Sequence, residues 1–143
     1  MSKTSTVRAE IAATEAIAEP TALALFHPCT QAWFTEAFAS PTRVQSESWP
    51  FLRKGESSLM LAPTGSGKTL AAFLAAHDGL LFAEKKPLPG VKGIYISPLK
   101  ALGVDVDRNL RAPLAGISAA AAREGTGHNA VTVAIRSGDT AVS

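Results

Sequence analysis

The fold prediction starts from residues 62–69, which read Ala62-Pro63-Thr64-Gly65-Ser66-Gly67-Lys68-Thr69. A short apolar run at 58–61 precedes this stretch, and a longer apolar run at 70–76 follows it. The order predicts a strand, a glycine-rich turn and a helix, which is the context of a phosphate-binding loop. The usual pattern opens with glycine, whereas this chain has Ala62, a residue that fits if the backbone φ stays negative there.

Each residue type in this loop suits a phosphate ligand. Glycines let the backbone curl so that successive N–H groups meet phosphate oxygens, and the positive end of the helix dipole adds to the attraction. Lys68 is expected to reach the β- and γ-phosphates, and the Thr69 hydroxyl to ligate Mg²⁺, which makes these two the candidate catalytic residues. The predicted loop residues are Thr64, Gly65, Ser66, Gly67, Lys68 and Thr69. The alternative is a glycine turn that only caps a helix.

Composition limits the class of protein. The 143 residues are 46% hydrophobic, which argues against wholesale disorder, and the net charge of +2 is too small to establish a nucleic-acid partner. The single cysteine, Cys29, excludes an internal disulfide. We find neither a signal-peptide core nor an apolar run long enough to span a membrane, and therefore expect a cytoplasmic protein without a membrane partner.

Apolar periodicity predicts alternating strands and helices. We predict strands at 57–62, 93–97 and 130–135, in an α/β fold with a parallel sheet flanked by helices. The predicted helices cover 29–39, 43–54 with Thr42 as N-cap, 67–84, 99–112 and 113–124, the last two divided at Pro113. We expect residues 1–22 to form a flexible tail.

The turns after the second and third predicted strands carry polar residues. Ser97-Pro98-Leu99-Lys100 follows one strand, and Arg136-Ser137-Gly138-Asp139-Thr140 follows the other. Ligands of open α/β sheets gather at the carboxyl ends of the strands, so both turns are candidates for contact with a nucleic-acid backbone. The alternative for each is an ordinary connecting loop.

Several motifs together resemble superfamily 2 helicases. Residues 38–45 resemble their Q-motif region, and residues 62–69 resemble their motif I. Residues 96–102 resemble motif Ia of one branch, the large helicase-related (Lhr) proteins, and residues 136–140 resemble the Thr-Gly-Asp-Thr element of that branch with Ser137 in place of the first threonine. The resemblance covers roughly residues 26–140, in matching order and spacing.

The resemblance implies a RecA-like P-loop NTPase domain, incomplete in these 143 residues, that uses ATP and Mg²⁺. By position in the family motifs, Gln45 would read adenine and Phe26 would stack on the base. The residues implied to contact nucleic acid, either single-stranded DNA or an RNA–DNA hybrid, are Ser97, Pro98, Lys100, Gly138 and Thr140. The family couples ATP hydrolysis to 3′→5′ movement along DNA.

The family's first motor domain also carries a DExH motif, yet no Asp-Glu pair occurs in this sequence. We therefore interpret residues 23–143 as the N-terminal part of helicase motor domain 1, truncated before that motif and without independent hydrolysis. The alternative is a non-catalytic module that binds nucleotide or nucleic acid without turnover. A small-molecule P-loop kinase is disfavoured, because it would leave the turns at 97–102 and 136–140 unexplained. The oligomeric state stays open.

Overall fold

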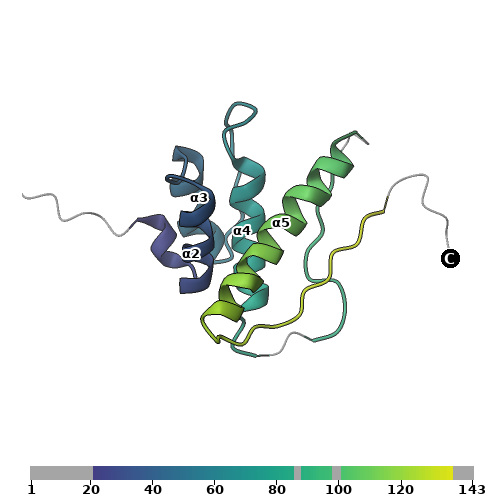
Figure 1. Cartoon of the computed structure of the whole chain (residues 1–143). Helices are drawn as coiled ribbons and strands as arrows, with labels where there is room; N and C mark the ends of the chain where they lie inside the picture. The colour runs from purple at the N-terminus through teal and green to yellow at the C-terminus, as the bar shows by residue number, and fades with distance from the viewer. Residues whose placement is uncertain (1–20, 86–87, 98–100, 137–143) are drawn as a thin grey trace, which may run out of the picture.

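The computed structural model describes residues 21–85, 88–97 and 101–136, with the side chains of 101–108 excepted. Within these residues the chain forms a short 3-10 helix and four α-helices (Figure 1). The elements are η2 (Ala22–Leu25), α2 (Pro28–Ala37), α3 (Arg43–Arg53), α4 (Lys68–Leu81) and α5 (Ala101–Arg123). Most of the predicted flexible tail, residues 1–20, lies outside the described residues.

Local sequence signals set the starts of three helices. Pro28 occupies the first turn of α2, where its missing N–H costs nothing, and the His27 side chain accepts a hydrogen bond from Cys29 N. Thr42 caps α3 as predicted, in a capping box with Gln45. Gly67, in the left-handed conformation, precedes the first residue of α4.

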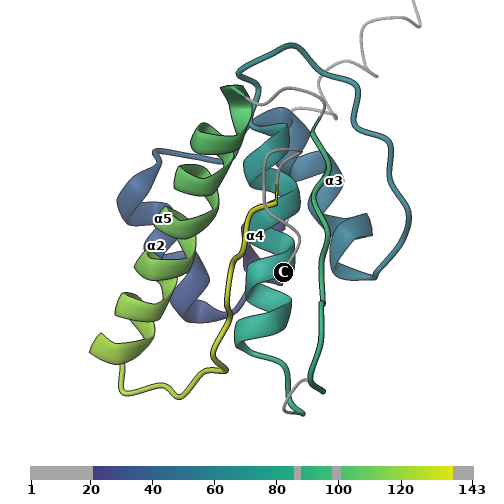
Figure 2. The same cartoon turned by 90° about the vertical axis from the view of Figure 1, so that its right-hand side faces the viewer.

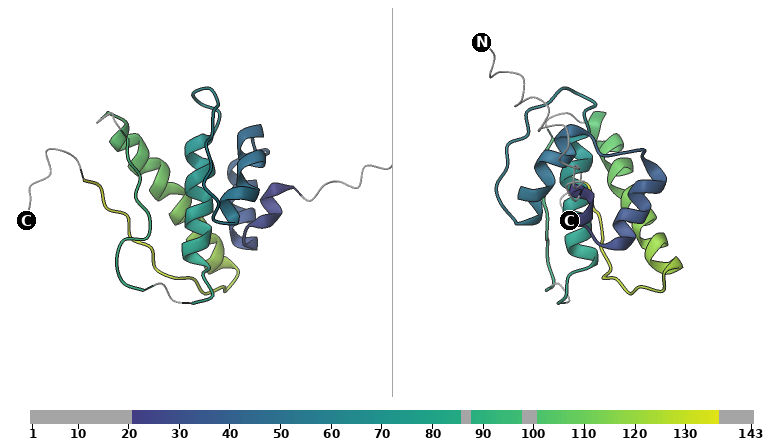
Figure 3. Two further views of the ribbon diagram at one scale, coloured as in Figure 1. Left: turned by 180° about the vertical axis from the view of Figure 1, so that it is seen from behind. Right: turned by 90° about the vertical axis from the view of Figure 1, so that its left-hand side faces the viewer.

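The core lies where α4 meets its neighbours. Viewed from behind, α4 stands between α3 and α5 (Figure 3). The largest fully buried side chains come from all four α-helices: Phe34 in α2, Trp49 in α3, Leu74 and Leu81 in α4, and Ile117 in α5. The Phe34 and Trp49 rings meet edge to face with centroids 5.6 Å apart. This aromatic packing fixes the position of α3, and therefore of the loop that joins α3 to α4.

The predicted α/β fold is wrong for the described part of the chain. The segments 57–62, 93–97 and 130–135 contain no strand, so there is no parallel sheet flanked by helices in the regions that the structure describes. Two of these segments, 91–97 and 130–136, instead run as extended chain beside α4 (Figure 2). The described residues therefore do not form the RecA-like sheet that the resemblance implied.

Side chains do alternate between contact with the helices and exposure to solvent along these segments, but the segments do not pair with one another as strands. Leu59 and Leu61 are 84% and 85% exposed, whereas Met60 between them packs against the core. Ile94 and Ile96 are 81% and 86% exposed, whereas the Tyr95 ring meets Phe73 of α4 at 5.0 Å. Each segment thus places alternate side chains on the helices, as a strand would, while the backbone ladder that defines a sheet is missing.

The predicted helix break at Pro113 is also wrong, because α5 continues from Ala101 to Arg123. A proline inside a helix costs roughly 3 kcal/mol through its missing N–H and its steric clash. Here Pro113 is buried, and it starts a buried stripe that continues through Ile117, Ala120 and Ala121 at helical spacing. Burial of this stripe against α2 and the core offsets the local penalty, so tertiary packing overrides the proline signal.

Candidate nucleotide-binding site

The loop between α3 and α4 has the backbone conformation predicted for a phosphate-binding loop. Gly65 has φ 81° and Gly67 has φ 91°, both in the left-handed region that favours glycine. Pro63, Thr64 and Gly65 are exposed at the tip of the loop, and α4 begins immediately after Gly67 (Figure 2). The glycines predicted to curl the backbone therefore do so.

Lys68 closes the base of this loop. Its ammonium group donates hydrogen bonds to the carbonyl oxygens of Ala62 and Pro63, the second at 2.8 Å. The side chain thus folds back from the first residue of α4 across the loop. A positive charge held inside the curl of a glycine-rich turn is the arrangement that a bound phosphate requires.

The first turn of α4 offers hydrogen-bond donors. Gly67 supplies no side-chain cap, and the turn contains no acidic residue. Its backbone N–H groups and the helix dipole therefore favour an anion. The Ser66 hydroxyl is buried in the loop with no hydrogen-bond partner among the described residues, and Thr69 is exposed at the second position of the helix. These residues fit a magnesium–nucleotide, with Ser66 as a further donor and Thr69 as the candidate metal ligand.

A set of hydrogen bonds ties the start of α3 to the loop. The Thr42 hydroxyl donates to Ser66 O at 2.8 Å, and the Gln45 amide donates to Gly67 O at 3.4 Å. Thr42 N donates to the Gln45 amide oxygen at 2.9 Å, which completes the capping box. We call these four residues the loop clasp. Sequence reasoning found Thr42 as a cap but missed its contact with the loop, because a cap motif carries no information about distant partners.

The clasp bears on the predicted role of Gln45. This residue is only 3% exposed, and both ends of its amide are engaged, the oxygen by Thr42 N and the nitrogen by Gly67 O. To read adenine, the amide would have to leave both partners. In the geometry described, Gln45 supports the loop.

Phe26, the predicted stacking partner of the base, is a core residue. Its ring packs edge to face on Trp49 at 4.9 Å and lies beneath the Arg53 guanidinium at 5.3 Å. The next residue, His27, donates its backbone N–H to Asp78, ten positions after Lys68 on α4. At 1.5 Å per residue this contact lies about 15 Å along the helix from the loop. The structure therefore does not bring Phe26 to the loop.

Of the residues predicted to contact nucleic acid, only Ser97 is described, and it is half-buried. Pro98, Lys100, Gly138 and Thr140 lie outside the described residues. Ser97 ends the extended segment that leads to α5, and the N-termini of α4 and α5 lie at the same end of the molecule (Figures 1 and 2). The start of α5 therefore lies at the end of the molecule that carries the nucleotide loop.

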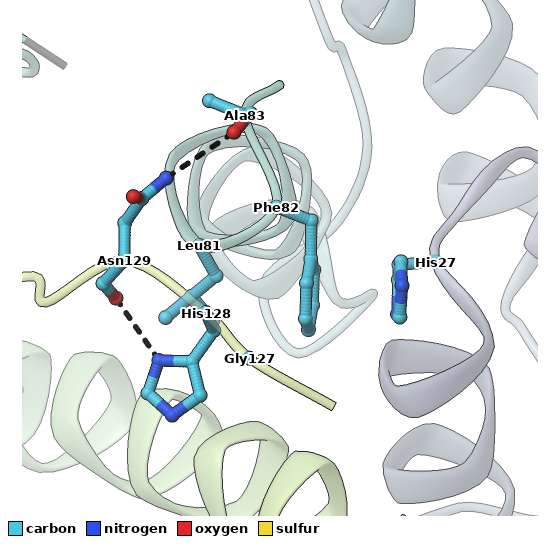
Figure 4. A pocket seen from close by; sticks show the side chains of 7 residues that line it. All are labelled: His27, Leu81, Phe82, Ala83, Gly127, His128 and Asn129. Atoms are coloured by element: carbon cyan, nitrogen blue, oxygen red, sulfur yellow. Dashed lines mark hydrogen bonds between the residues drawn. The ribbon is translucent and has the colours of Figure 1, made fainter. Parts of the chain in front are cut away.

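A pocket of about 340 Å³ lies at the other end of α4 (Figure 4). The His27 and Phe82 rings stack in it with centroids 3.7 Å apart, and Asn129 hydrogen-bonds the last carbonyls of the helix. Its lining consists of His27, Leu81, Phe82, Ala83, Gly127, His128 and Asn129. None of the predicted site residues belongs to this pocket, and its main polar contacts close the end of the helix.

No helix in the described part of the chain is both long and apolar enough to cross a membrane.

Comparison with known proteins supports the motif assignments. Residues 42–138 match the family model described as DEAD/DEAH box helicase. The chain is 52% identical over 118 residues to an Lhr helicase/probable uracil glycosylase of Mycolicibacterium smegmatis, and 46% identical over 124 residues to an Lhr helicase/uracil glycosylase of Escherichia coli. A solved structure, Mycobacterium smegmatis helicase Lhr bound to ssDNA and AMP-PNP, matches with a TM-score of 0.76 and 50% identity over 84% of the chain. The resemblance to the Lhr branch is confirmed.

These matches cover most of the chain but little of the relatives. The alignments take in 82% and 81% of this chain, yet 8% of each of the two relatives. The chain also spans 15% of the solved helicase. The similarity therefore concerns one small part of much longer proteins.

Proposed function

Because the chain belongs to the DEAD/DEAH box helicase family, we propose that its loop at 62–69 binds ATP with Mg²⁺. We further propose that the chain is the ATP-binding part of a DNA helicase that couples ATP hydrolysis to 3′→5′ translocation. The observation that carries the proposal is the glycine loop with left-handed Gly65 and Gly67, closed by Lys68 at the uncapped start of α4. A glycine turn that served only as a helix cap would not need a lysine folded across it.

The residues of the loop have separate tasks in this proposal. The backbone N–H groups of the first turn of α4 hold phosphate oxygens, and Lys68 exchanges the carbonyls of Ala62 and Pro63 for the β- and γ-phosphates. The Thr69 hydroxyl would hold the metal ion, which would supply positive charge to offset the charge that develops on the phosphates. Thr64 and Ser66 complete the rim of the loop, with the unpaired Ser66 hydroxyl free to donate.

Adenine selection by Gln45 requires a change of hydrogen-bond partners. Gln45 would accept from N6–H and donate to N7 of adenine after exchanging its two present partners, so its loss should erode the preference for ATP over GTP. Phe26 would need to leave its packing on Trp49 to stack on the base, and we assign it to the core instead.

The proposed nucleic-acid surface begins at Ser97, which precedes α5 in the sequence. The similar solved helicase is bound to ssDNA and AMP-PNP, which supports a surface for single-stranded DNA here. We propose that Ser97, Pro98, Lys100, Gly138 and Thr140 contact the sugar-phosphate backbone, because contacts that ignore base identity suit a moving motor. An RNA–DNA hybrid would offer the same backbone chemistry.

Hydrolysis needs more than these residues. Phosphoryl transfer requires a positioned water and acidic metal ligands, and the 143 residues contain no Asp-Glu pair. We therefore expect this chain by itself to bind nucleotide without steady-state ATPase activity, with or without single-stranded DNA. A DNA-stimulated rate that disappears in Lys68→Ala would contradict this expectation.

Calorimetric titration with Mg–AMP-PNP tests the nucleotide site. Lys68→Ala removes a charge-assisted contact with the phosphates and should cost about 1.5–3 kcal/mol, or roughly 10- to 150-fold in Kd. The matched control is Lys54→Ala, which removes an exposed lysine at the end of α3 and should leave Kd within about twofold. Equal affinity in wild type and Lys68→Ala would refute the assignment of the loop.

A further inference from the structure

His77 is a buried polar residue that takes no part in the proposed nucleotide site. It lies in the middle of α4 and is only 4% exposed. Its Nε2 atom lies 3.1 Å from the carbonyl oxygen of Leu110 in α5, and its ring stacks loosely on Phe73 with centroids 6.2 Å apart. This hydrogen bond joins the middles of two helices that are far apart in the sequence.

The chemistry of the contact fixes the state of the ring. A carbonyl oxygen can only accept, so Nε2 must carry the hydrogen. Burial lowers the pKa of His77, which favours the neutral form of the ring. His77 is therefore a neutral donor, and its partner is a backbone atom whose position does not depend on a side-chain rotamer.

The acceptor lies in the turn of α5 that Pro113 disturbs. Proline has no N–H, so position 113 gives no hydrogen bond to the carbonyl of Asn109, and the proline ring crowds the preceding turn. Leu110 is in this turn, three residues before Pro113. His77 thus adds a hydrogen bond to the carbonyl that follows the one deprived of its donor, and this contact supports the turn where α5 continues through the proline.

The position of the contact along both helices gives it a functional meaning. His77 lies nine residues after Lys68, the first residue of α4, and Leu110 lies nine residues after Ala101, the first residue of α5. At 1.5 Å per residue, each helix extends about 14 Å from the contact to its start. Those two starts lie at the same end of the molecule (Figure 1). One follows the nucleotide loop, and the other follows residues 97–100, which include three of the residues proposed to contact nucleic acid.

We propose that His77 is a positioning residue that fixes the first half of α5 against α4, and thereby couples the nucleotide loop to the start of α5, next to the residues proposed to contact single-stranded DNA. The proposal rests on the proposed function. His77 touches neither ligand, so its loss should change the coupling between the two ligands more than the affinity for the nucleotide alone.

Three substitutions separate the hydrogen bond from the volume of the ring. His77→Gln keeps an N–H donor of similar reach, His77→Phe fills the space without a donor, and Pro113→Ala restores the backbone N–H to α5. The expected loss in melting temperature is roughly 3–8 °C for His77→Phe. In the Pro113→Ala background this loss should fall by at least half, because the restored N–H bonds the carbonyl of Asn109 and the turn that carries the Leu110 carbonyl then depends less on His77.

The unfolding cycle needs no ligand. If the changes in melting temperature from His77→Phe and Pro113→Ala were additive, the hydrogen bond of His77 would not support the turn at Pro113. If His77→Phe does not fold, His77→Leu takes its place in the same cycle. The unfolding measurements also separate the role of His77 from the proposed function. If the wild-type chain bound no nucleotide, the proposed function would be refuted, and the double-mutant cycle would still test the hydrogen bond between His77 and Leu110.

The functional arm measures the Kd for fluorescent oligo(dT) with and without saturating Mg–AMP-PNP. The factor by which the nucleotide changes this Kd should move at least threefold towards 1 in His77→Phe and stay at the wild-type value in His77→Gln. The Kd for Mg–AMP-PNP alone should stay within twofold in both. A wild-type factor of 1, an unchanged factor in His77→Phe, or failure of His77→Gln to preserve the factor would each overturn the proposal.

Discussion

At its first turn α4 presents backbone N–H groups without a side-chain cap, whereas at its last turn the carbonyls of Leu80, Leu81 and Ala83 all accept hydrogen bonds from Asn129. The first turn follows exposed residues and two left-handed glycines. The last turn is next to the buried carboxylate of Asp78. The two ends of α4 therefore differ: the protein supplies hydrogen-bond partners for the backbone groups at the last turn and leaves those at the first turn without a side-chain cap.

The closed end is held by a buried ion pair. Asp78 is 2% exposed; one carboxylate oxygen accepts from His27 N at 2.8 Å, and the other lies 2.9 Å from the Arg53 guanidinium. These contacts connect α4 to α3 and to the segment before α2. A helix whose far end is anchored in this way can leave its near end open without losing its position, which is what a ligand-binding turn requires.

The largest expected effect is at the closed end. Asp78→Ala leaves Arg53 without its partner and the buried His27 N–H without an acceptor, and should lower the free energy of unfolding by about 3–5 kcal/mol. Chemical denaturation measures this loss. Since Asp78 lies ten residues from Lys68, the folded fraction should keep its Kd for Mg–AMP-PNP within about twofold.

The exposed ion pair of α3 provides the control for this substitution. Arg43 Nε and Glu47 Oε1 are 2.6 Å apart with side chains 89% and 64% exposed, so Arg43→Ala should leave the free energy of unfolding almost unchanged. If Asp78→Ala costs no more than Arg43→Ala, the closed end is not anchored as described.

Glycine-to-alanine substitutions near the two ends of α4 should have opposite effects on the stability of the chain. Gly67→Ala places a side chain at φ 91° and a Cβ 2.6 Å from the Gln45 amide nitrogen, so it should distort the loop by about 1–2 kcal/mol and weaken Mg–AMP-PNP binding roughly 5- to 30-fold. Gly79→Ala lies inside the helix, with Arg53 no closer than 3.6 Å, and should stabilise the chain by about 0.5–1 kcal/mol. Equal effects of the two substitutions on binding would contradict the contrast between the ends.

The cap of the last turn can be tested separately. The Asn129 side chain donates to Leu80 O at 3.1 Å and to Ala83 O at 3.4 Å, while its backbone N–H bonds Leu81 O and survives truncation. Asn129→Ala should therefore cost about 1 kcal/mol of stability without changing nucleotide affinity. Asn109→Ala, at an exposed position of α5, is the matched control and should be close to neutral. A cost equal to that of the control would show that Asn129 does not cap the helix.

The smallest effect is a dependence on pH in the middle of α4. Burial lowers the pKa of His77 below its ordinary value of 6.5, so below that pH the unfolded chain takes up a proton that the native chain resists. The free energy of unfolding should fall as the pH drops from about 6.5, by at most about 1.4 kcal/mol per pH unit from this group. His77→Gln should flatten the profile between pH 5 and 7, and identical slopes in the two proteins would contradict the assignment.

The open end of α4 was predictable because its signals are local. Gly67, Lys68 and the cap at Thr42 act within a few residues of themselves, and the structure places them as the sequence indicates. The sequence-based description of the loop therefore needed only its own eight residues. The predicted helix starts at 29, 43 and 67 lie within one residue of the observed starts at 28, 43 and 68.

The predictions that failed depend on distant partners. Apolar alternation at 57–62 and 93–97 predicted strands, but pairing requires a second segment at the right register, which the described residues do not provide. Pro113 predicted a break, but the buried stripe through Ile117 overrode it. Tertiary contacts that no sequence window contains also set the core position of Phe26 and the clasp of Gln45, whose roles at adenine stay predictions.

Amide hydrogen exchange of the wild-type chain with and without saturating Mg–AMP-PNP tests the contrast between the two ends of α4 most directly. With nucleotide bound, we expect slower exchange at residues 65–71, where the loop and the first turn would hold the phosphates. Exchange at 79–83 and 127–130 should be unchanged. Protection at the closed end, or nucleotide binding that leaves 65–71 unprotected, would contradict this contrast.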